Sequence, residues 1–230
     1  MTDYIKLPIG QGYHPCLNDH GEFVLITKLS TSTESETWLD PAAIATVAVQ
    51  DTLALPEVLN GVKFALWTDA PTTRHGWADV SGQNVADEPD MAVQQGMHTS
   101  AGVVIVETDG RIWIVHPTNT FGGYNASFAK GRIENGIPLQ ASAIKEAFEE
   151  SGLQVTLTSF FQDVVRSTSV SRYYWAKRVG GTPAAAGWES QAVSLVPKDM
   201  LKDFLDQAVD KGMADQIMIR KDRGSNSTLF

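Results

Sequence analysis

Three glutamates, Glu146, Glu149 and Glu150, stand close together in a stretch with helical spacing. Residues three and four apart are neighbours on a helix surface, so these carboxylates share one face, and each like-charged pair costs about 0.2–0.5 kcal/mol. A divalent cation is the simplest partner that offsets this repulsion, because Mg²⁺ favours carboxylate and carbonyl oxygens beside substrate phosphates. A solvated acidic face is the alternative, and charge runs are usually of that kind.

The helix that carries the glutamates has clear boundaries. Pro138 suits its first turn and Gly152 is a natural stop. Ile144, Ala147 and Phe148 recur at helical spacing on the other side, which predicts a stripe that faces the core. The turn between Gly131 and Gly136 precedes the helix and allows backbone carbonyls to approach a bound ion.

The surrounding segments read mainly as strands. The stretch "AGVVIVETDGRIWIVHP" places two apolar runs around Asp109-Gly110, a pair typical of a hairpin. Because both runs are apolar at nearly every position, we expect strands that are covered on both faces. Further elements are predicted by composition and periodicity: strands at 128–134, 153–165, 172–179 and 192–196, and a final amphipathic helix over 197–209.

This order of elements predicts an α+β fold, a mixed sheet with helices packed against both faces. We divide the chain into residues 97–230, which hold these elements, and residues 1–96, an extension or small domain of unknown fold and role. In the N-terminal part, Asp40-Pro41 looks like the start of a helix, and residues 69–90 read as loop.

Composition narrows the class of protein. The 230 residues are 43% hydrophobic and 20% charged, an ordinary globular balance, with a net charge of −9. This charge argues against a nucleic-acid binder and against a polybasic membrane protein. The single cysteine, Cys16, suits a reducing compartment, and the N-terminus lacks the pattern of a secretory signal. We expect a cytoplasmic protein without a membrane span.

Residues 131–153 resemble the Nudix box, G-x5-E-x7-R-E-U-x-E-E-x-G-U, in which U is a bulky apolar residue. Gly131 matches the opening glycine, and "KEAFEESGL" (145–153) matches the second half of the box, with the three glutamates in register. Two positions depart from the pattern, because Ile137 replaces the first glutamate and Lys145 replaces the arginine. In the family these two side chains brace the loop and helix. We expect that brace to be absent here, since Ile137 cannot accept an ion pair, and Lys145 can instead form a weak pair with Glu149.

The resemblance implies an α/β/α sandwich with a mixed sheet and an enzyme that hydrolyses nucleoside diphosphates linked to another group, with Mg²⁺ or Mn²⁺. Glu146, Glu149 and Glu150 would be catalytic and would hold the metal, together with the backbone carbonyl of Lys130. Family members often recruit one more acid from beyond the box, and Glu189 is our candidate.

The substrate would be held by cationic and aromatic side chains. Arginine suits bidentate contact with phosphate, and an aromatic ring can stack on a base. The candidates for these contacts are Lys130, Arg132, Arg166, Arg172, Tyr124 and Tyr174. An exposed surface charge or a core aromatic is the alternative for each of them.

The branch of the family is only weakly indicated. The stretch after the box lacks the proline typical of the ADP-ribose branch, while Tyr173, Tyr174 and the "KGR" entry favour dinucleoside polyphosphates or related nucleotides. Because Nudix proteins are often dimers, a homodimer is expected. The main alternative is a Nudix-fold module that senses a nucleotide without hydrolysing it, which Ile137 and Lys145 favour.

Overall fold

The structure, a computed structural model, describes residues 7–49, 51 and 54–219. Its longer strands are β6 (His98–Val106), β7 (Ile112–Pro117), β9 (Leu153–Val165), β10 (Ser169–Gly181) and β11 (Ser190–Val196). The shorter strands are β1 (Gly12–Tyr13), β2 (Leu25–Ile26), β3 (Ala45–Ala48), β4 (Val58–Leu59), β5 (Val62–Lys63) and β8 (Lys130–Arg132). The α-helices are α1 (Arg74–Ala78), α2 (Leu139–Ser151), α3 (Leu201–Phe204) and α4 (Ala208–Ile219). Short 3-10 segments lie at Ser35–Trp38, Thr118–Gly123, Pro183–Ala185 and Lys198–Met200.

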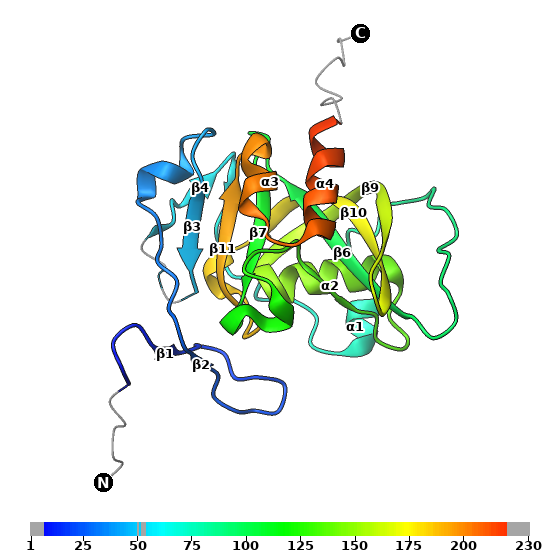
Figure 1. Ribbon diagram of the computed structural model, residues 1–230, viewed down its shortest axis with the longest axis horizontal. Helices are drawn as coiled ribbons and strands as arrows, with labels where there is room; N and C mark the ends of the chain where they lie inside the picture. The colour runs from blue at the N-terminus through cyan, green and yellow to red at the C-terminus, as the bar shows by residue number, and fades with distance from the viewer. Residues whose placement is uncertain (1–6, 50, 52–53, 220–230) are drawn as a thin grey trace.

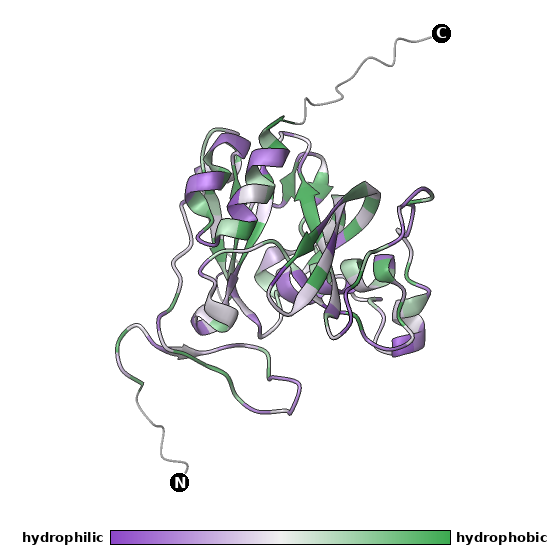
Figure 2. Cartoon of the chain, turned by 45° about the vertical axis from the view of Figure 1, so that its right-hand side comes forward, coloured by the Kyte–Doolittle hydropathy of each residue, from purple (hydrophilic) through white to green (hydrophobic). Residues whose placement is uncertain are grey.

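Seven strands form one mixed sheet in the order β3-β11-β7-β6-β10-β9, with β8 paired to β6. The β6–β10 pair is parallel, and the other pairs of this sheet are antiparallel. Apolar side chains on the two faces of the sheet belong to two separate core clusters. One cluster includes α2, and the other includes α3 and α4. The expected mixed sheet with helices on both faces is therefore confirmed (Figure 1). Figure 2 shows hydrophobic residues along the central strands, and both hydrophobic and hydrophilic residues along the helices beside them.

Two local predictions around the glutamate helix are confirmed. Strands β6 and β7 form a hairpin in which Val106 pairs with Ile112, and Gly110 adopts a positive φ of 89°. Helix α2 begins after Pro138 and ends at Gly152, whose φ of 68° is left-handed. A Cβ at Gly152 would lie 2.3 Å from the Thr182 carbonyl oxygen, so this position requires glycine for its conformation and for its space.

The residues before position 97 pack into the same core as α2. Trp38, Val47, Leu59 and Trp77 are buried in the cluster that contains this helix. In addition, β3 pairs antiparallel with β11 and forms an edge of the main sheet. The N-terminal part thus contributes to the hydrophobic core and to the sheet of the rest of the chain.

Two expectations about helices were wrong. Asp40-Pro41 does not open a helix: the Asp40 carboxylate accepts a hydrogen bond from the Ala42 N–H at 2.9 Å, which closes a turn that leads into β3. The single helix expected over 197–209 is instead interrupted after Phe204, and α4 continues to Ile219. Among the described residues, no helix is both long and apolar enough to cross a membrane.

Candidate active site

Helix α2 presents its carboxylates to a pocket of about 1140 Å³, to which Glu146, Glu149 and Glu150 all contribute. The Glu146 carboxylate lies against the backbone of β8, where a Cβ at Gly131 would come within 2.2 Å of its Oε2 atom. A side chain at position 131 would therefore displace this carboxylate from its present position. The Glu150 Oε2 atom accepts a hydrogen bond from the Lys130 backbone N–H at 3.1 Å, which ties α2 to β8.

Glu189 lines the same pocket from the loop that precedes β11. This loop is attached to the helix, because the Gly187 N–H donates to the Glu149 carbonyl oxygen at 2.7 Å. Gly187 and Glu189, 34 and 36 positions beyond the end of the box at residue 153, therefore lie beside its glutamates. The structure brings together all four acids that the sequence singled out.

The pocket disfavours negative charge on its own carboxylates. Burial, followed by repulsion from Glu150 and Glu149, raises the pKa of Glu146 to about 9. Burial also raises the pKa of Glu150 to about 8, although the Lys130 ammonium opposes this shift. The pKa values of Glu149 and Glu189 are raised as well, first by burial. Such a site favours either protons or a cation.

The donor set fits a hard divalent ion, because it consists of carboxylate oxygens that gain from a nearby positive charge. Within residues 7–49, 51 and 54–219, no group of three His, Cys, Asp or Glu side chains stands ready to hold a metal ion. The fit is therefore one of donor chemistry and of proximity within one pocket.

Lys145 forms the brace that the sequence led us to expect to be missing. Its Nζ lies 2.8 Å from Glu134 Oε1 and 2.5 Å from Glu149 Oε2. Burial alone would lower the pKa of Lys145, but its contacts with Glu134 and Glu149 raise it above its ordinary value. Ile137 is 4% exposed and belongs to the core. Glu134, three positions before Ile137, thus supplies the carboxylate that joins loop and helix, and the expectation of no brace was wrong.

Two of the predicted cations line the pocket. Lys130 places its Nζ 4.7 Å from the centre of the Tyr124 ring, and Tyr124 also lines the pocket. Arg132 is exposed at the pocket, as is Arg74 of α1. In the described part of the chain, neither of these two arginines forms an ion pair, so both guanidinium groups are available to an anion.

The other three substrate candidates lie outside this pocket, which corrects the expectation for each. Arg172 is 1% exposed and binds Asp163 with two contacts of 2.7 Å. Tyr174 is buried and donates its hydroxyl hydrogen to Glu88 at 2.6 Å. The physical reason is that β10 is covered on both faces, so neither set of alternating side chains reaches the pocket.

Arg166 is also engaged within the protein. Its guanidinium binds Asp210 at 2.8 Å, the Tyr124 hydroxyl at 2.7 Å and the Tyr173 hydroxyl at 3.0 Å. Arg166 therefore holds the Tyr124 side chain through its hydroxyl group. Arg166 itself is not among the residues that line the pocket with the carboxylates.

Sequence reasoning missed several residues that line the pocket. They are Asp19 and Arg74 from the N-terminal part, Glu134 from the loop before α2, and Trp188 beside Glu189. Position relative to the box could have suggested Glu134 and Trp188. No local signal marked Asp19 or Arg74, because long-range packing alone brings them to the pocket.

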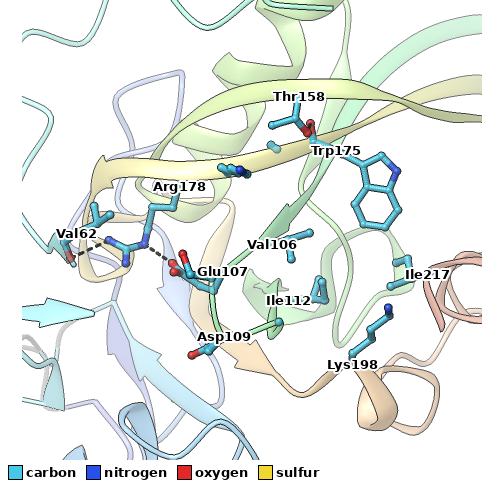
Figure 3. Close-up of a pocket in the computed structure, with 14 residues that line it drawn as sticks. Val62, Val106, Glu107, Asp109, Ile112, Thr158, Trp175, Arg178, Lys198 and Ile217 are labelled. Carbon is cyan, nitrogen blue, oxygen red and sulfur yellow. Dashed lines mark hydrogen bonds and ion pairs between the residues drawn. The ribbon is translucent and has the colours of Figure 1, made fainter. Parts of the chain in front are cut away.

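A second cavity, of about 540 Å³, lies between the ends of β6, β7 and β10 (Figure 3). Its walls combine apolar side chains, among them Ile112 and Ile217, with polar and charged ones such as Asp109 and Lys177. Its buried charges are satisfied internally, because Arg178 binds Glu107 and also donates to the Leu59 carbonyl oxygen at 2.8 Å. The two carboxylates that line this cavity, Glu107 and Asp109, are each paired with an arginine, Arg178 and Arg111 respectively.

Comparison with known proteins establishes the family to which the chain belongs. The NUDIX domain family model matches residues 96–217, more than half of the chain, and the chain therefore belongs to the Nudix family. Over 111 residues it is 32% identical to "Uncharacterized Nudix hydrolase orf19" of Rhodococcus erythropolis; the match covers 46% of this chain and 58% of the relative. The chain thus spans less than two thirds of that relative's length.

Solved structures of the family are more distant. A NUDIX hydrolase from Nitrosomonas europaea is 16% identical, with a TM-score of 0.47 over 56% of this chain and 74% of that one. A structure from a study of MutT from Aliivibrio salmonicida and Vibrio cholerae is 19% identical, with a TM-score of 0.45 over 54% of this chain and 98% of that one. Because both TM-scores are below 0.5, family membership rests on the domain match.

Proposed function

We propose that this protein is a divalent-metal-dependent hydrolase that cleaves the pyrophosphate of a nucleoside diphosphate linked to another group. One observation carries the proposal: Glu146, Glu149, Glu150 and Glu189 face one pocket together with unpaired Arg132. We assign the catalytic domain to residues 97–230 and treat residues 1–96 as an extension that packs against it.

Glu146, Glu149 and Glu150 would hold Mg²⁺ or Mn²⁺, together with the Lys130 carbonyl oxygen. When bound, such an ion neutralises pyrophosphate charge and lowers the pKa of a coordinated water. Glu189 would accept the proton of the attacking water, because it lines the same pocket and burial raises its pKa above the ordinary value of a glutamate. Lys130 and Arg132 would bind phosphate oxygens, and Arg74 would do so from the opposite wall.

The substrate class we favour is a dinucleoside polyphosphate or a related nucleotide. The pocket of about 1140 Å³ is larger than most small-molecule sites, so it has room for a substrate of two parts. Tyr124 and the exposed Phe121 offer rings for a base. The support we drew from Tyr173 and Tyr174 falls away, because both are buried.

The substrate is tested with a panel that contains dinucleoside polyphosphates, ADP-ribose, NADH and nucleoside triphosphates, each with Mg²⁺ and with Mn²⁺. We expect fastest hydrolysis of the dinucleoside polyphosphates. Preference for ADP-ribose would overturn the substrate class and leave the hydrolase intact. Binding of a nucleotide without turnover of any compound would favour the sensing module, in which Lys145 keeps Glu149 occupied.

We further propose that the protein acts in the cytoplasm as a homodimer on small molecules, without nucleic-acid or membrane partners. Its net charge of −9 supports the absence of a polyanionic partner. Light scattering tests the dimer, because a particle of 25.0 kDa at micromolar concentration would contradict it.

A further inference from the structure

The N-terminal hairpin, residues 10–29, lies outside the domain match yet reaches the candidate active site. It carries β1 and β2 and stands away from the main sheet at the lower left of Figure 1. Cys16, Leu17 and Asp19 at its bend line the same pocket as Glu149. The hairpin therefore forms one wall of that pocket.

Its first attachment is to the loop that carries Glu189. His14 is 3% exposed, and its Nε2 lies 3.0 Å from the Ser190 carbonyl oxygen. The Cys16 N–H donates to His14 Nδ1 at 3.0 Å, so Nε2 carries the proton and donates to Ser190. On the other side of Glu189, the Trp188 indole N–H donates to Asp19 Oδ1 at 3.0 Å. The hairpin thus holds both neighbours of Glu189.

Its second attachment is to the loop that carries Phe121. The Asn119 side chain accepts hydrogen bonds from the Thr27 N–H and hydroxyl, both at 2.8 Å, and donates to the Leu25 carbonyl oxygen at 2.7 Å. Thr120 follows with a φ of 57°, a left-handed conformation that is strained for a β-branched residue. Asn119 itself has a positive φ of 53°, so the three hydrogen bonds from the hairpin hold the residue at which this left-handed turn begins.

The two loops are also joined to each other, because the Thr118 N–H donates to the Glu189 carbonyl oxygen at 2.7 Å. Phe121 is 63% exposed at the pocket, and its ring lies 6.5 Å from that of Trp188. A displacement of either loop would therefore move both an acid and an aromatic surface of the pocket.

We propose that the N-terminal hairpin is an integral part of the active site and that His14 is a positioning residue that holds the Glu189 loop against the pocket. The consequence for catalysis rests on the hydrolase function proposed above. The hairpin thus forms one wall of the pocket, although its residues 10–29 precede the part of the chain that matches the Nudix domain, residues 96–217.

The test compares His14→Ala with His14→Gln, which can still donate to Ser190, and with His20→Ala, an exposed histidine of the same hairpin, in the full chain. We expect kcat/KM of His14→Ala to fall about 10- to 100-fold, the range that misplacement by about 1 Å can cause. Hydrogen exchange of residues 186–191 should rise in the same variant. His14→Gln should recover most of both properties, and His20→Ala should match the wild type.

A second comparison asks whether His14 acts through Glu189. In a Glu189→Gln background, His14→Ala should lower kcat/KM by less than it does in the wild type, because the group it positions is already disabled. Full additivity of the two changes would overturn the assignment.

The two readouts separate this inference from the proposed function. Unchanged exchange at 186–191 in His14→Ala would overturn the inference whatever the activity. Increased exchange with wild-type kcat/KM would also overturn it, since the loop would then not serve the site. If the wild type hydrolyses nothing, the proposed function fails, and calorimetric affinity for ADP with Mg²⁺ replaces kcat/KM in the comparison.

Discussion

The buried carboxylate of Glu146 destabilises the fold when it is charged, although the same charge would help to hold a metal ion. Its carboxylate is buried beside Glu149 and Glu150, against the backbone of Gly131. The structure tolerates this arrangement because Gly131 leaves space and because a proton or a cation can neutralise the charge. A residue selected for stability alone would not be ionisable at this position.

The first prediction concerns the pH dependence of stability without metal. The pKa of Glu146 is about 9 in the folded chain and about 4.3 in an unfolded one. The folded state binds this proton more tightly, so stability is greatest below the unfolded pKa and is lost as pH rises through the folded pKa. Glu146→Gln removes this loss. In EDTA, we expect it to raise Tm at pH 8 by a few °C and to have little effect at pH 4.5, measured by calorimetry.

Glu57→Gln is the control, because that side chain is 82% exposed and pairs only with Lys63. Two results would contradict the conclusion that the buried charge of Glu146 lowers stability. One is an equal rise in Tm for Glu57→Gln, and the other is a lower Tm for Glu146→Gln at pH 8.

The second prediction concerns Lys145. Its bridge between Glu134 and Glu149 orients a carboxylate that we assign to the metal, and partners of metal ligands typically contribute 10–100-fold. We expect Lys145→Met to weaken Mn²⁺ binding and kcat by about this range, while Lys145→Arg keeps most of both. Mn²⁺ titration followed by electron paramagnetic resonance gives the affinity.

The matched control is Lys202→Met, which removes an exposed ion pair with Asp215. Equal Mn²⁺ affinities for Lys145→Met and the wild type would show that the bridge does not orient Glu149.

At the scale of elements, α2 depends on a close crossing at its C-terminal end. Gly152 ends the helix where β10 and the loop after it pass within contact, so a Cβ there would lie 2.3 Å from Thr182 O and 2.9 Å from the Ala185 carbonyl carbon. The loop that passes Gly152 continues to Gly187, whose N–H donates to the Glu149 carbonyl oxygen at 2.7 Å.

The third prediction uses two glycines with similar backbone conformations. Gly152 has a φ of 68° and is crowded, whereas Gly110 has a φ of 89° with nothing within 4 Å of a built Cβ. We expect Gly110→Ala to cost about 1 kcal/mol for conformation alone. Gly152→Ala should cost at least about 2–3 kcal/mol more, because backbone must move. Urea unfolding measures both, and equal losses would argue against the crowded crossing.

At the scale of the whole molecule, the N-terminal part completes the core. Trp38 is fully buried and packs 5.9 Å from Trp113 of β7, between ring centroids. β3 covers the edge of β11, which would otherwise present unpaired backbone groups. The residues before the Nudix domain therefore complete its hydrophobic core and cover an edge of its sheet.

The fourth prediction follows from this packing. A chain that begins at residue 97 should aggregate or melt at a much lower temperature than the full chain, because it exposes the α2 core cluster and the β11 edge. Analytical size exclusion and calorimetry provide the measurement. A soluble, cooperatively melting 97–230 fragment would contradict the account.

The elements that sequence could predict are those with strong local signals. Helix α2 has its stripe, Pro138 and Gly152, and the β6–β7 hairpin has Asp109-Gly110, so both were found. The internal contacts of Arg172 and Tyr174 could not be predicted. Alternation along β10 indicates which residues share a face, but it does not indicate that both faces are covered. Asp19, Arg74 and His14 reach the site only through long-range packing. The brace formed by Lys145 was not predicted, because its partner Glu134 lies three positions before position 137, where the motif has its bracing glutamate.

The assignment of Glu149 to a metal-dependent hydrolase site is tested by nucleotide release from a dinucleoside polyphosphate. The release is measured with and without Mg²⁺, for the wild type and for Glu149→Gln. The account predicts turnover only with metal, and a fall of at least about 100-fold in kcat when Glu149 loses its charge. Metal-dependent turnover at the wild-type rate in Glu149→Gln would contradict the assignment of this carboxylate, and with it the proposed site.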